Sequence, residues 1–208
     1  MIGKITARNI VWSRIVLIML ATIFCQSGKA QEYHGNTPLM ESALQGDLAT
    51  VKRLVEVEHV DVNALNALGL NALYFAAGAS PTRPIEQGVA GSTEVLRYLL
   101  KRAANPNANS NRNGMTALMT AATNRRADRV KLLLDHRANP NSATSLGSTA
   151  LMDAVSRSDL KTIKLLLGHG ANPNSATRHG RTALMDAIDG GDVQAIKLLV
   201  KAGADIPR

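Results

Sequence analysis

Carboxylate side chains recur at a fixed spacing in the second half of the chain. Asp153 and Asp186 stand at equivalent places in two similar segments, and Asp189 follows one helical turn after Asp186. Two carboxyl groups that flank a bond can act as the acid and the base of glycoside hydrolysis. That chemistry needs an apolar pocket that raises the pKa of one carboxyl group, and the surrounding sequence shows no sign of one. We therefore expect a solvated acidic strip on the exposed side of a helix.

Histidines offer a second kind of chemistry, because imidazole is a common metal ligand. His136 and His169 are separated by the same interval as Asp153 and Asp186. Equivalent residues of stacked helices stand about 10 Å apart, so this pair is expected to form a row and no metal site. The sequence also lacks a Gly-rich phosphate loop, a nucleophile elbow and a catalytic triad. We predict no catalytic residues, no metal and no cofactor.

Basic residues form two clusters, which suggests nucleic-acid binding as one interpretation. The clusters are Arg97, Lys101 and Arg102, and then Arg125, Arg126, Arg129, Lys131 and Arg137. Base stacking needs aromatic side chains, and the chain has only 2 Phe, 3 Tyr and 1 Trp. Several of these cations fall on the outward side of predicted helices, where they aid solubility, and no nucleic acid is expected. Arg125 and Arg126 instead occupy a predicted helix junction and are a candidate contact for an acidic partner.

The elements that position these residues come from an internal repeat. The segment from Gly147 to Asn174 recurs from Gly180 and from Gly114. This fixed step of about 33 residues is typical of proteins in which one supersecondary unit stacks on the next. Most residues within the period are then committed to packing, so we expect function on the surface.

Each copy predicts two helices that are separated by a polar break. The Thr149 hydroxyl can cap the first helix and Asp159 the second. An apolar set at helical spacing, from Leu160 to Leu167, buries one side of the second helix. Gly170 stands where a positive φ is needed after the helix. The same pattern returns with Thr182, Asp192 and Gly203. The predicted fold class is all-α.

The residues Gly-x-Thr-Ala-Leu-Met through Leu-Leu-Leu-x-x-Gly-Ala-Asn-Pro-Asn resemble the ankyrin repeat, over about Gly35 to Asp205. The resemblance implies a solenoid of five stacked helix-turn-helix units with projecting β-turns. The five units are placed at about 35–68, 69–113, 114–146, 147–179 and 180–208, with an insertion at 80–90 in the second. We expect the insertion to be a surface loop, and alternatively a wall of the groove. The Pro of the family survives only at Pro38, and Met or Tyr takes the place of its His.

Residues 1–30 have a different character from the repeats. Lys4, Arg8 and Arg14 precede an apolar run from Ile15 to Cys25, and Ala30 lies at a small-residue cleavage motif. These features predict a secretory signal peptide that is cleaved after Ala30, and therefore a periplasmic or secreted protein. A membrane anchor is the alternative, although the run is shorter than the roughly 20 residues that span a bilayer. A lipoprotein attached at Cys25 is a further alternative.

Cleavage would change the composition of the mature protein, residues 31–208. Cys25 is the one cysteine in the sequence, so the mature protein would have no disulfide. The leader carries four basic residues and no acid, so the formal net charge would fall from +8 to +4. No membrane span is expected in the mature protein.

The resemblance implies a non-catalytic module that binds one protein partner, as a monomer, through a concave groove and the β-turns. In ankyrin repeats the contacts come from residues beside the opening Gly and from the first helix. By register those positions are Arg112, Asn113, Met115, Thr120, Thr123, Asn124, Ser145, Leu146, Ser148, Asp153, Ser156, Arg157, Arg178, His179, Arg181, Asp186 and Asp189. Because Arg is frequent at binding hot spots, we expect the strongest contacts at Arg112, Arg157, Arg178 and Arg181, with apolar support from Tyr74 and Phe75.

Exported proteins similar to this one have been linked to two roles. One is support of a periplasmic enzyme such as catalase, and the other is neutralisation of a toxin by an immunity protein. The resemblance leaves both open. An enzyme, or an enzyme modulator with its own small-molecule site, is the alternative from another functional class.

Overall fold

The computed structural model describes residues 35–78, 92–108 and 113–206. Contacts along the chain divide the protein into two units, Met1–Gly35 and Asn36–Arg208, and apart from Gly35 the described residues belong to the second unit. The predicted signal peptide, the insertion at 80–90 and Arg112 lie outside the described residues. Within the described ranges, every helix is too short or too polar to span a lipid bilayer.

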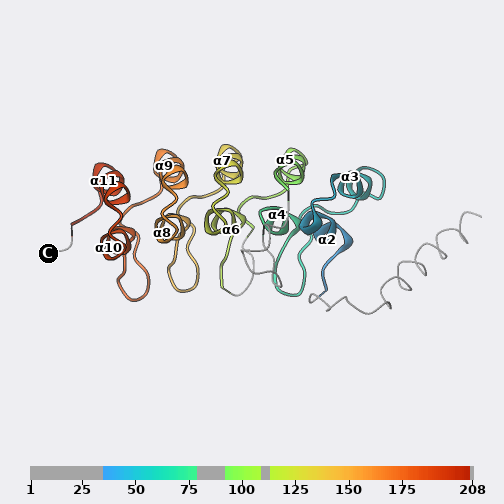
Figure 1. Ribbon diagram of the computed structural model, residues 1–208. Coiled ribbons are helices and arrows are strands. Elements are labelled where there is room, and N and C mark those ends of the chain that lie inside the picture. Colours follow the sequence, from blue (N-terminus) through green and yellow to red (C-terminus); the bar gives the residue numbers. More distant parts are fainter. Residues whose placement is uncertain (1–34, 79–91, 109–112, 207–208) are drawn as a thin grey trace, which may run out of the picture. The chain divides into compact units, whose positions relative to one another are not determined.

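The described part of the second unit consists of ten α-helices in two layers (Figure 1). The inner layer contains α2 (Pro38–Gln45), α4 (Ala72–Ala76), α6 (Ala117–Thr123), α8 (Ala150–Ser156) and α10 (Ala183–Asp189). The outer layer contains α3 (Leu48–Glu56), α5 (Thr93–Lys101), α7 (Ala127–Asp135), α9 (Leu160–Gly168) and α11 (Val193–Lys201). Each inner helix packs against its outer partner and its neighbours in the inner layer. This all-α repeat stack confirms the predicted fold class.

Side-chain caps begin the helices at the predicted residues. The Thr149 hydroxyl accepts a hydrogen bond from the Met152 amide at 3.4 Å and begins α8. The Asp159 carboxylate accepts from the Thr162 amide at 3.2 Å and begins α9. Each cap satisfies an amide that has no partner within its own helix. Helix starts in this protein therefore follow directly from residue type.

Helix ends require a left-handed backbone conformation. Gly170 and Gly203 follow α9 and α11 with φ of 82° and 88°. The equivalent residues after α5 and α7 are Ala103 and Arg137, whose φ values are 62° and 66°. Non-Gly residues adopt this region at a cost. The stack therefore imposes the same turn even where glycine is absent.

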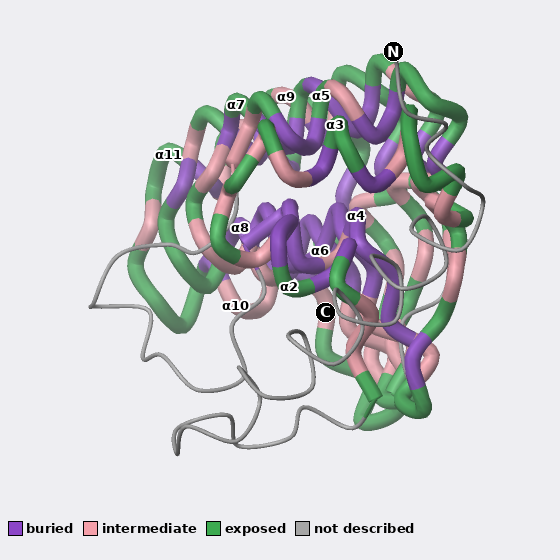
Figure 2. The backbone as a smooth tube through the Cα atoms, turned by 90° about the vertical axis from the view of Figure 1, so that its right-hand side faces the viewer, coloured by how far each residue is buried: buried purple, intermediate pink, exposed green. Residues whose placement is uncertain are grey.

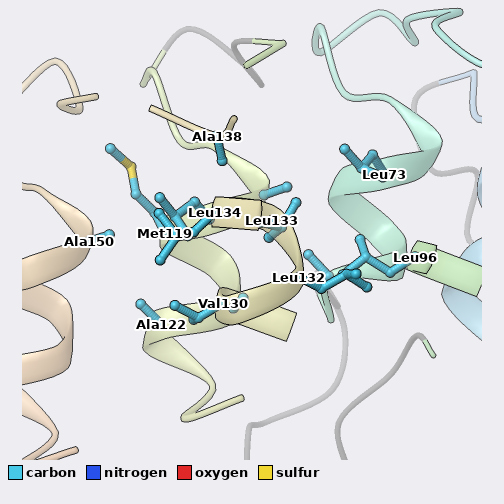
Figure 3. Close-up of a cluster of buried hydrophobic side chains, with 14 of the residues drawn as sticks. Leu73, Leu96, Met119, Ala122, Val130, Leu132, Leu133, Leu134, Ala138 and Ala150 are labelled. Atoms are coloured by element: carbon cyan, nitrogen blue, oxygen red, sulfur yellow. The ribbon is translucent and has the colours of Figure 1, made fainter. Parts of the chain in front are cut away.

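The hydrophobic core lies between the two helix layers, where buried segments face each other (Figure 2). Leu118 of α6 and Leu133 of α7 are 1% and 0% exposed, and Met119 fills the space beside them (Figure 3). Met119 and Met152 stand where the ankyrin repeats that the sequence resembles carry His, and both are buried. A flexible thioether fills irregular gaps well, so apolar packing replaces the polar contacts of a histidine at this position.

Asparagines join each repeat to the next at the ends of the outer helices. Asn141 donates a hydrogen bond from Nδ2 to the carbonyl oxygen of Gly170 at 2.9 Å. Its Oδ1 accepts from the amide of Asn172 at 2.7 Å. Asn107 and Asn174 make the equivalent pairs of bonds. One side chain thus holds two backbone groups of the following repeat in register.

Candidate functional site

Two β-turn fingers project from the inner layer, and we define them as residues 143–149 and 176–182. Each is closed by an antiparallel bridge, Ala143 to Thr149 in the first and Ala176 to Thr182 in the second. The amide of Thr144 donates to the carbonyl of Ser148 at 2.9 Å. Hydrogen bonds across such short loops restrict the backbone, so the finger tips hold their positions without a ligand.

The fingers are also bonded to one another. The amide of Arg178 donates to the carbonyl oxygen of Leu146 at 2.9 Å, and the amide of Ser145 donates to that of Asn113 at 2.8 Å. Gly147 makes this close approach possible. A Cβ added there would lie 2.9 Å from Thr177 Cα and 3.0 Å from Ala176 O. The backbone of three successive repeats therefore forms one connected edge.

The predicted contact residues on this edge are exposed. Leu146 is 59% exposed, and Asn113, Ser145, Arg178 and His179 are exposed beside it. These residues follow one another along the edge that the backbone hydrogen bonds between neighbouring repeats connect. An apolar tip flanked by a cation and an imidazole can bind a partner surface of mixed polarity.

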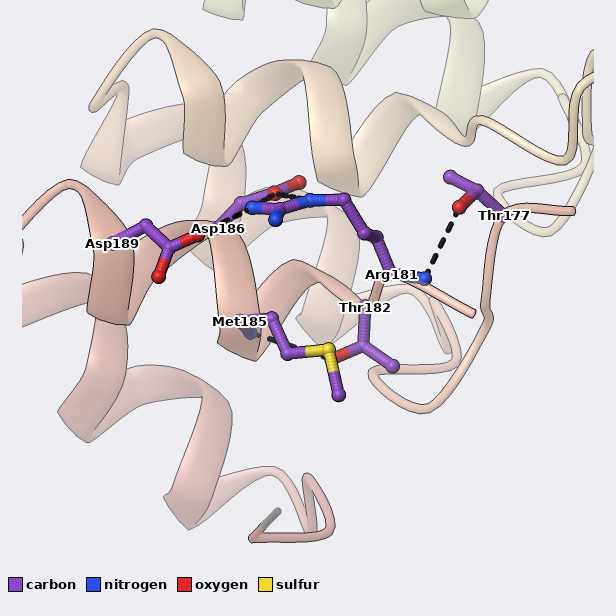
Figure 4. A network of polar contacts seen from close by, with 6 residues as sticks. All are labelled: Thr177, Arg181, Thr182, Met185, Asp186 and Asp189. Carbon is purple, nitrogen blue, oxygen red and sulfur yellow. Dashed lines mark hydrogen bonds and ion pairs between the residues drawn. The ribbon is translucent and has the colours of Figure 1, made fainter. Parts of the chain in front are cut away.

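Arg181 is held by two carboxylates of its own repeat (Figure 4). Its Nε lies 2.9 Å from Asp186 Oδ1, and its Nη2 lies 2.7 Å from Asp189 Oδ2. Hydrogen bonds to Asp189 and Asp186 raise the pKa of the Arg181 guanidinium. The three charges compensate one another, so they offer a partner a hydrogen-bonded cluster with one net negative charge. Arg178, which is exposed in the same finger, is the more available cation.

Asp153 differs from the solvated carboxylate that the sequence predicts. It is half-buried, and burial raises the pKa of its carboxyl group, while the hydrogen bond with Thr123 and the charge of Arg157 act in the opposite direction. The shift reflects the loss of hydration of the charged form. Asp153 lies on inner helix α8, and exposed Arg157 is the C-cap residue of that helix.

Two predicted contact residues are buried and are corrected here. Thr120 is 5% exposed and Phe75 is 1% exposed. Thr120 lies beside Tyr74 of α4, and burial raises the pKa of the Tyr74 hydroxyl. The side chains are enclosed because α6 packs closely against α4 and α8. Thr120 and Phe75 therefore support the inner layer and are not available to a partner.

Other predicted contacts serve packing between repeats as well. Met115 and Asn124 are half-buried, and Asn124 donates from Nδ2 to the carbonyl of Gly78 at 3.0 Å. The structure adds two residues that the sequence analysis missed, Leu65 and Leu68, which are 56% and 43% exposed. Leu68 precedes Gly69 as Leu146 precedes Gly147, so the register of the repeat was a signal for it.

The basic clusters separate into different environments. Arg129 is 4% exposed, and its Nε lies 3.3 Å from Thr93 Oγ1. Arg125 has a φ of 56°, in the position that glycine takes at Gly191. Arg126 is the N-cap residue of α7 and makes no side-chain capping bond. Arg125 and Arg126 thus occupy the junction that the sequence predicts, at a local cost in backbone strain and capping.

The two histidines in register cap helix ends. His136 Nδ1 lies 2.9 Å from the carbonyl oxygen of Leu132, and His169 Nδ1 lies 2.8 Å from that of Leu165. His169 Nε2 also stands 3.7 Å from Asp135 Oδ1. No cluster of three or more His, Cys, Asp or Glu suitable for a metal occurs in the part of the chain that the structure describes.

Comparison with known proteins identifies the repeat. A family model described as "Ankyrin repeats (3 copies)" matches residues 88–144 and 138–208. A second model, described as "Ankyrin repeat", matches residues 34–67. Together the matches cover most of the chain. No curated protein matches the sequence.

Proposed function

The chain belongs to the ankyrin repeat family, and on that premise we propose that it is a non-catalytic, exported module that binds one protein partner through the edge formed by its two fingers. Ankyrin repeats are protein-protein interaction modules. The lack of catalysis, the export, the binding face and the single partner are the parts that we propose for this chain.

The connected finger edge carries this proposal. Its tips present Leu146, Arg178 and His179 on a backbone that is already bonded from one repeat to the next. A binding surface that is ordered before the partner arrives loses less conformational entropy on binding. A rigid edge with an apolar tip and a cation that forms no ion pair with another described residue therefore suits recognition of a folded partner.

Hot spots of protein interfaces combine desolvated apolar contacts with arginine. Leu146 supplies the apolar contact and Arg178 the cation on the edge, and Arg157 adds a second exposed cation at the end of inner helix α8. The Arg181 cluster is expected to contribute hydrogen-bond acceptors, because both of its carboxylates remain partly exposed.

Export is proposed from the predicted signal peptide. We expect the protein to be recovered from the periplasm or the medium, and Edman sequencing of the mature chain to begin at Gln31. Recovery in the cytoplasm with residues 1–30 intact would contradict the proposed export and would leave the binding face unaffected.

Affinity purification tests the binding face. The tagged protein is used to recover partners from a periplasmic extract, and the affinity of the partner identified by mass spectrometry is then measured. Leu146→Asp with Arg178→Glu should weaken this affinity by at least about 30-fold, as loss of one hot spot of roughly 2 kcal/mol would. Lys52→Glu, an exposed change on α3 in the outer layer, is the matched control. Equal affinity of both variants would count against the finger edge.

A further inference from the structure

One position of the outer helices is basic in every repeat. This position is the fifth residue of each helix, and its five occupants are Lys52, Arg97, Lys131, Lys164 and Lys197. All five are exposed. Because the outer helices lie side by side in one layer (Figure 1), the five cations form a row across the stack, with neighbours about 10 Å apart.

Acidic side chains accompany this row in the first three repeats. Lys131 Nζ lies 2.7 Å from Asp135 Oδ2 on the same helix. Arg102 forms an ion pair with Glu56 of the neighbouring outer helix. Glu94 lies on α5, on the same helical face as Arg97. The outer face of α3, α5 and α7 is therefore a mixture of both signs.

The last two outer helices lack these acidic residues. Helices α9 and α11 carry Lys161, Lys164, Lys197 and Lys201, and neither helix contains an acidic residue. All four lysines are exposed, and none forms an ion pair with another described residue. We call these four residues the lysine face.

The spacing within each helix places the four ammonium groups on one side. Lys161 and Lys164 are three residues apart on α9, and Lys197 and Lys201 are four apart on α11, so each pair shares a helix face. Helix α9 packs against α11. Exposed Val193 and Val200 adjoin the lysines on α11 and are 56% and 43% exposed. The result is a cationic surface with an aliphatic border.

We propose that the lysine face binds an anionic lipid surface. Lysine is a hydrated point charge without the planar fork with which arginine recognises a single carboxylate or phosphate. Four lysines and no arginine therefore suit many diffuse negative charges better than one specific partner group. Aliphatic side chains at the border can enter the headgroup region of a bilayer.

The residue types of the lysine face favour lipid over other polyanions. Protein hot spots favour Trp, Tyr and Arg, and binding of single-stranded nucleic acid favours aromatic platforms. The described residues of α9 and α11 contain none of these residue types. The lysine face lies in the outer layer, whereas the fingers project from the inner layer (Figure 1). Lipid and the proposed protein partner could therefore be bound at the same time.

Sedimentation with lipid vesicles tests the proposal on the full chain. Vesicles of phosphatidylcholine with roughly 30% phosphatidylglycerol, whose surface potential is negative, are compared with pure phosphatidylcholine vesicles. Each lysine near an anionic surface is worth about a fivefold change in partitioning. The variant Lys161→Gln, Lys164→Gln, Lys197→Gln and Lys201→Gln should therefore bind the anionic vesicles at least about 50-fold less well.

A matched variant removes the same charge from the mixed part of the outer layer. It carries Lys52→Gln, Arg97→Gln, Lys101→Gln and Lys131→Gln. Residues 1–30 are unchanged in both variants. We expect it to lose less than about fivefold in partitioning. An equal loss in both variants would assign the binding to net charge and overturn the proposal. Binding of a polyglutamate peptide without binding of vesicles would overturn it in favour of an acidic protein.

A local probe reports contact at the face itself. A polarity-sensitive fluorophore is attached at Gln194→Cys on α11, in a chain that also carries Cys25→Ser, and its emission should shift to the blue on the anionic vesicles. The same fluorophore at Ser156→Cys on the inner helix α8 should not shift. An unshifted probe at position 194 on vesicles that do bind the protein would place the contact elsewhere and overturn the proposal.

Discussion

The amide of Arg178 donates a hydrogen bond of 2.9 Å to the carbonyl oxygen of Leu146. These residues occupy the tips of neighbouring fingers, and both side chains are exposed. The bond ties the shape of the proposed binding edge to the register between repeats. Changes that loosen the packing of one finger should therefore affect both stability and binding.

Gly147→Ala is expected to loosen the finger edge. The new Cβ would meet the backbone of the next finger at 2.9 Å, at a residue with a φ of 82°. We expect a loss of roughly 2–3 kcal/mol in the free energy of unfolding, since a strained backbone and a forced shift both contribute. Urea unfolding followed by circular dichroism measures it.

Gly180→Ala is the control for that change. Gly180 also has a positive φ, of 74°, but nothing lies within 4 Å of an added Cβ. We expect a loss of about 1 kcal/mol from the backbone conformation alone. If both variants lost the same amount, contact between the fingers would not contribute to stability.

Asp159→Ala should cost more than the removal of an ordinary helix cap. Asp159 Oδ2 also accepts a hydrogen bond of 2.7 Å from the hydroxyl of Thr162, which is 0% exposed. The variant loses the helix cap and leaves the buried Thr162 hydroxyl without this acceptor. We therefore expect a loss of about 2–3 kcal/mol in the free energy of unfolding. Asp192→Ala is the matched control, because the residue at the equivalent position is Ala195, and it should cost about 1 kcal/mol. Thermal unfolding that ranks the two variants in the opposite order would refute this explanation.

Arg126→Asp is expected to stabilise the protein. Arg126 begins α7 without a capping bond, whereas Asp159 and Asp192 cap the equivalent helices. The new carboxylate should gain about 1 kcal/mol by accepting from the first turn of α7. Arg97→Asp makes the same charge change on an exposed residue inside α5 and should bring no gain. A gain in Arg97→Asp as large as that in Arg126→Asp would assign the effect to net charge.

The raised pKa of Asp153 predicts a pH dependence of stability. The folded state holds the proton of this carboxyl group more tightly than the unfolded chain, whose value is near 3.8. Stability from this group is therefore lost as the pH rises from about 3.8 through the raised pKa in the folded state. Asp153→Asn has no such loss, so its stability relative to the original protein should increase over that window and then level off.

Two measurements check this prediction. Urea unfolding of both proteins between pH 3 and pH 7 should show the growing difference, and a constant difference would contradict it. NMR titration of the Asp153 carboxyl carbon should give a midpoint above 3.8. Thr123→Val removes a hydrogen bond that lowers this pKa, so the midpoint should move further upward in that variant.

The repeated local pattern made much of the fold predictable. Thr149 and Asp159 cap their helices as expected, because a capping bond joins residues three positions apart and depends little on distant contacts. Predictions about side-chain environment were less reliable. Thr120 is equivalent in register to Asp153 and Asp186, yet Thr120 is buried and the two aspartates are half-buried. The exposure differs because the side chains packed around this position differ from repeat to repeat.

The sequence by itself determined the period, the paired helices, their caps and the positive-φ turn at Gly170, since these follow from interactions within about four residues. Only the tertiary structure decided which polar side chains are available to a partner. Burial of Arg129, pairing of Arg181 with Asp186 and Asp189, and the bond between Arg178 and Leu146 depend on side-chain directions and on packing between repeats. The contacts of Arg129 and of Arg178 join groups of different repeats, whose distances become defined only when the repeats are stacked. The Arg181 cluster lies within one repeat and depends on the directions of its side chains.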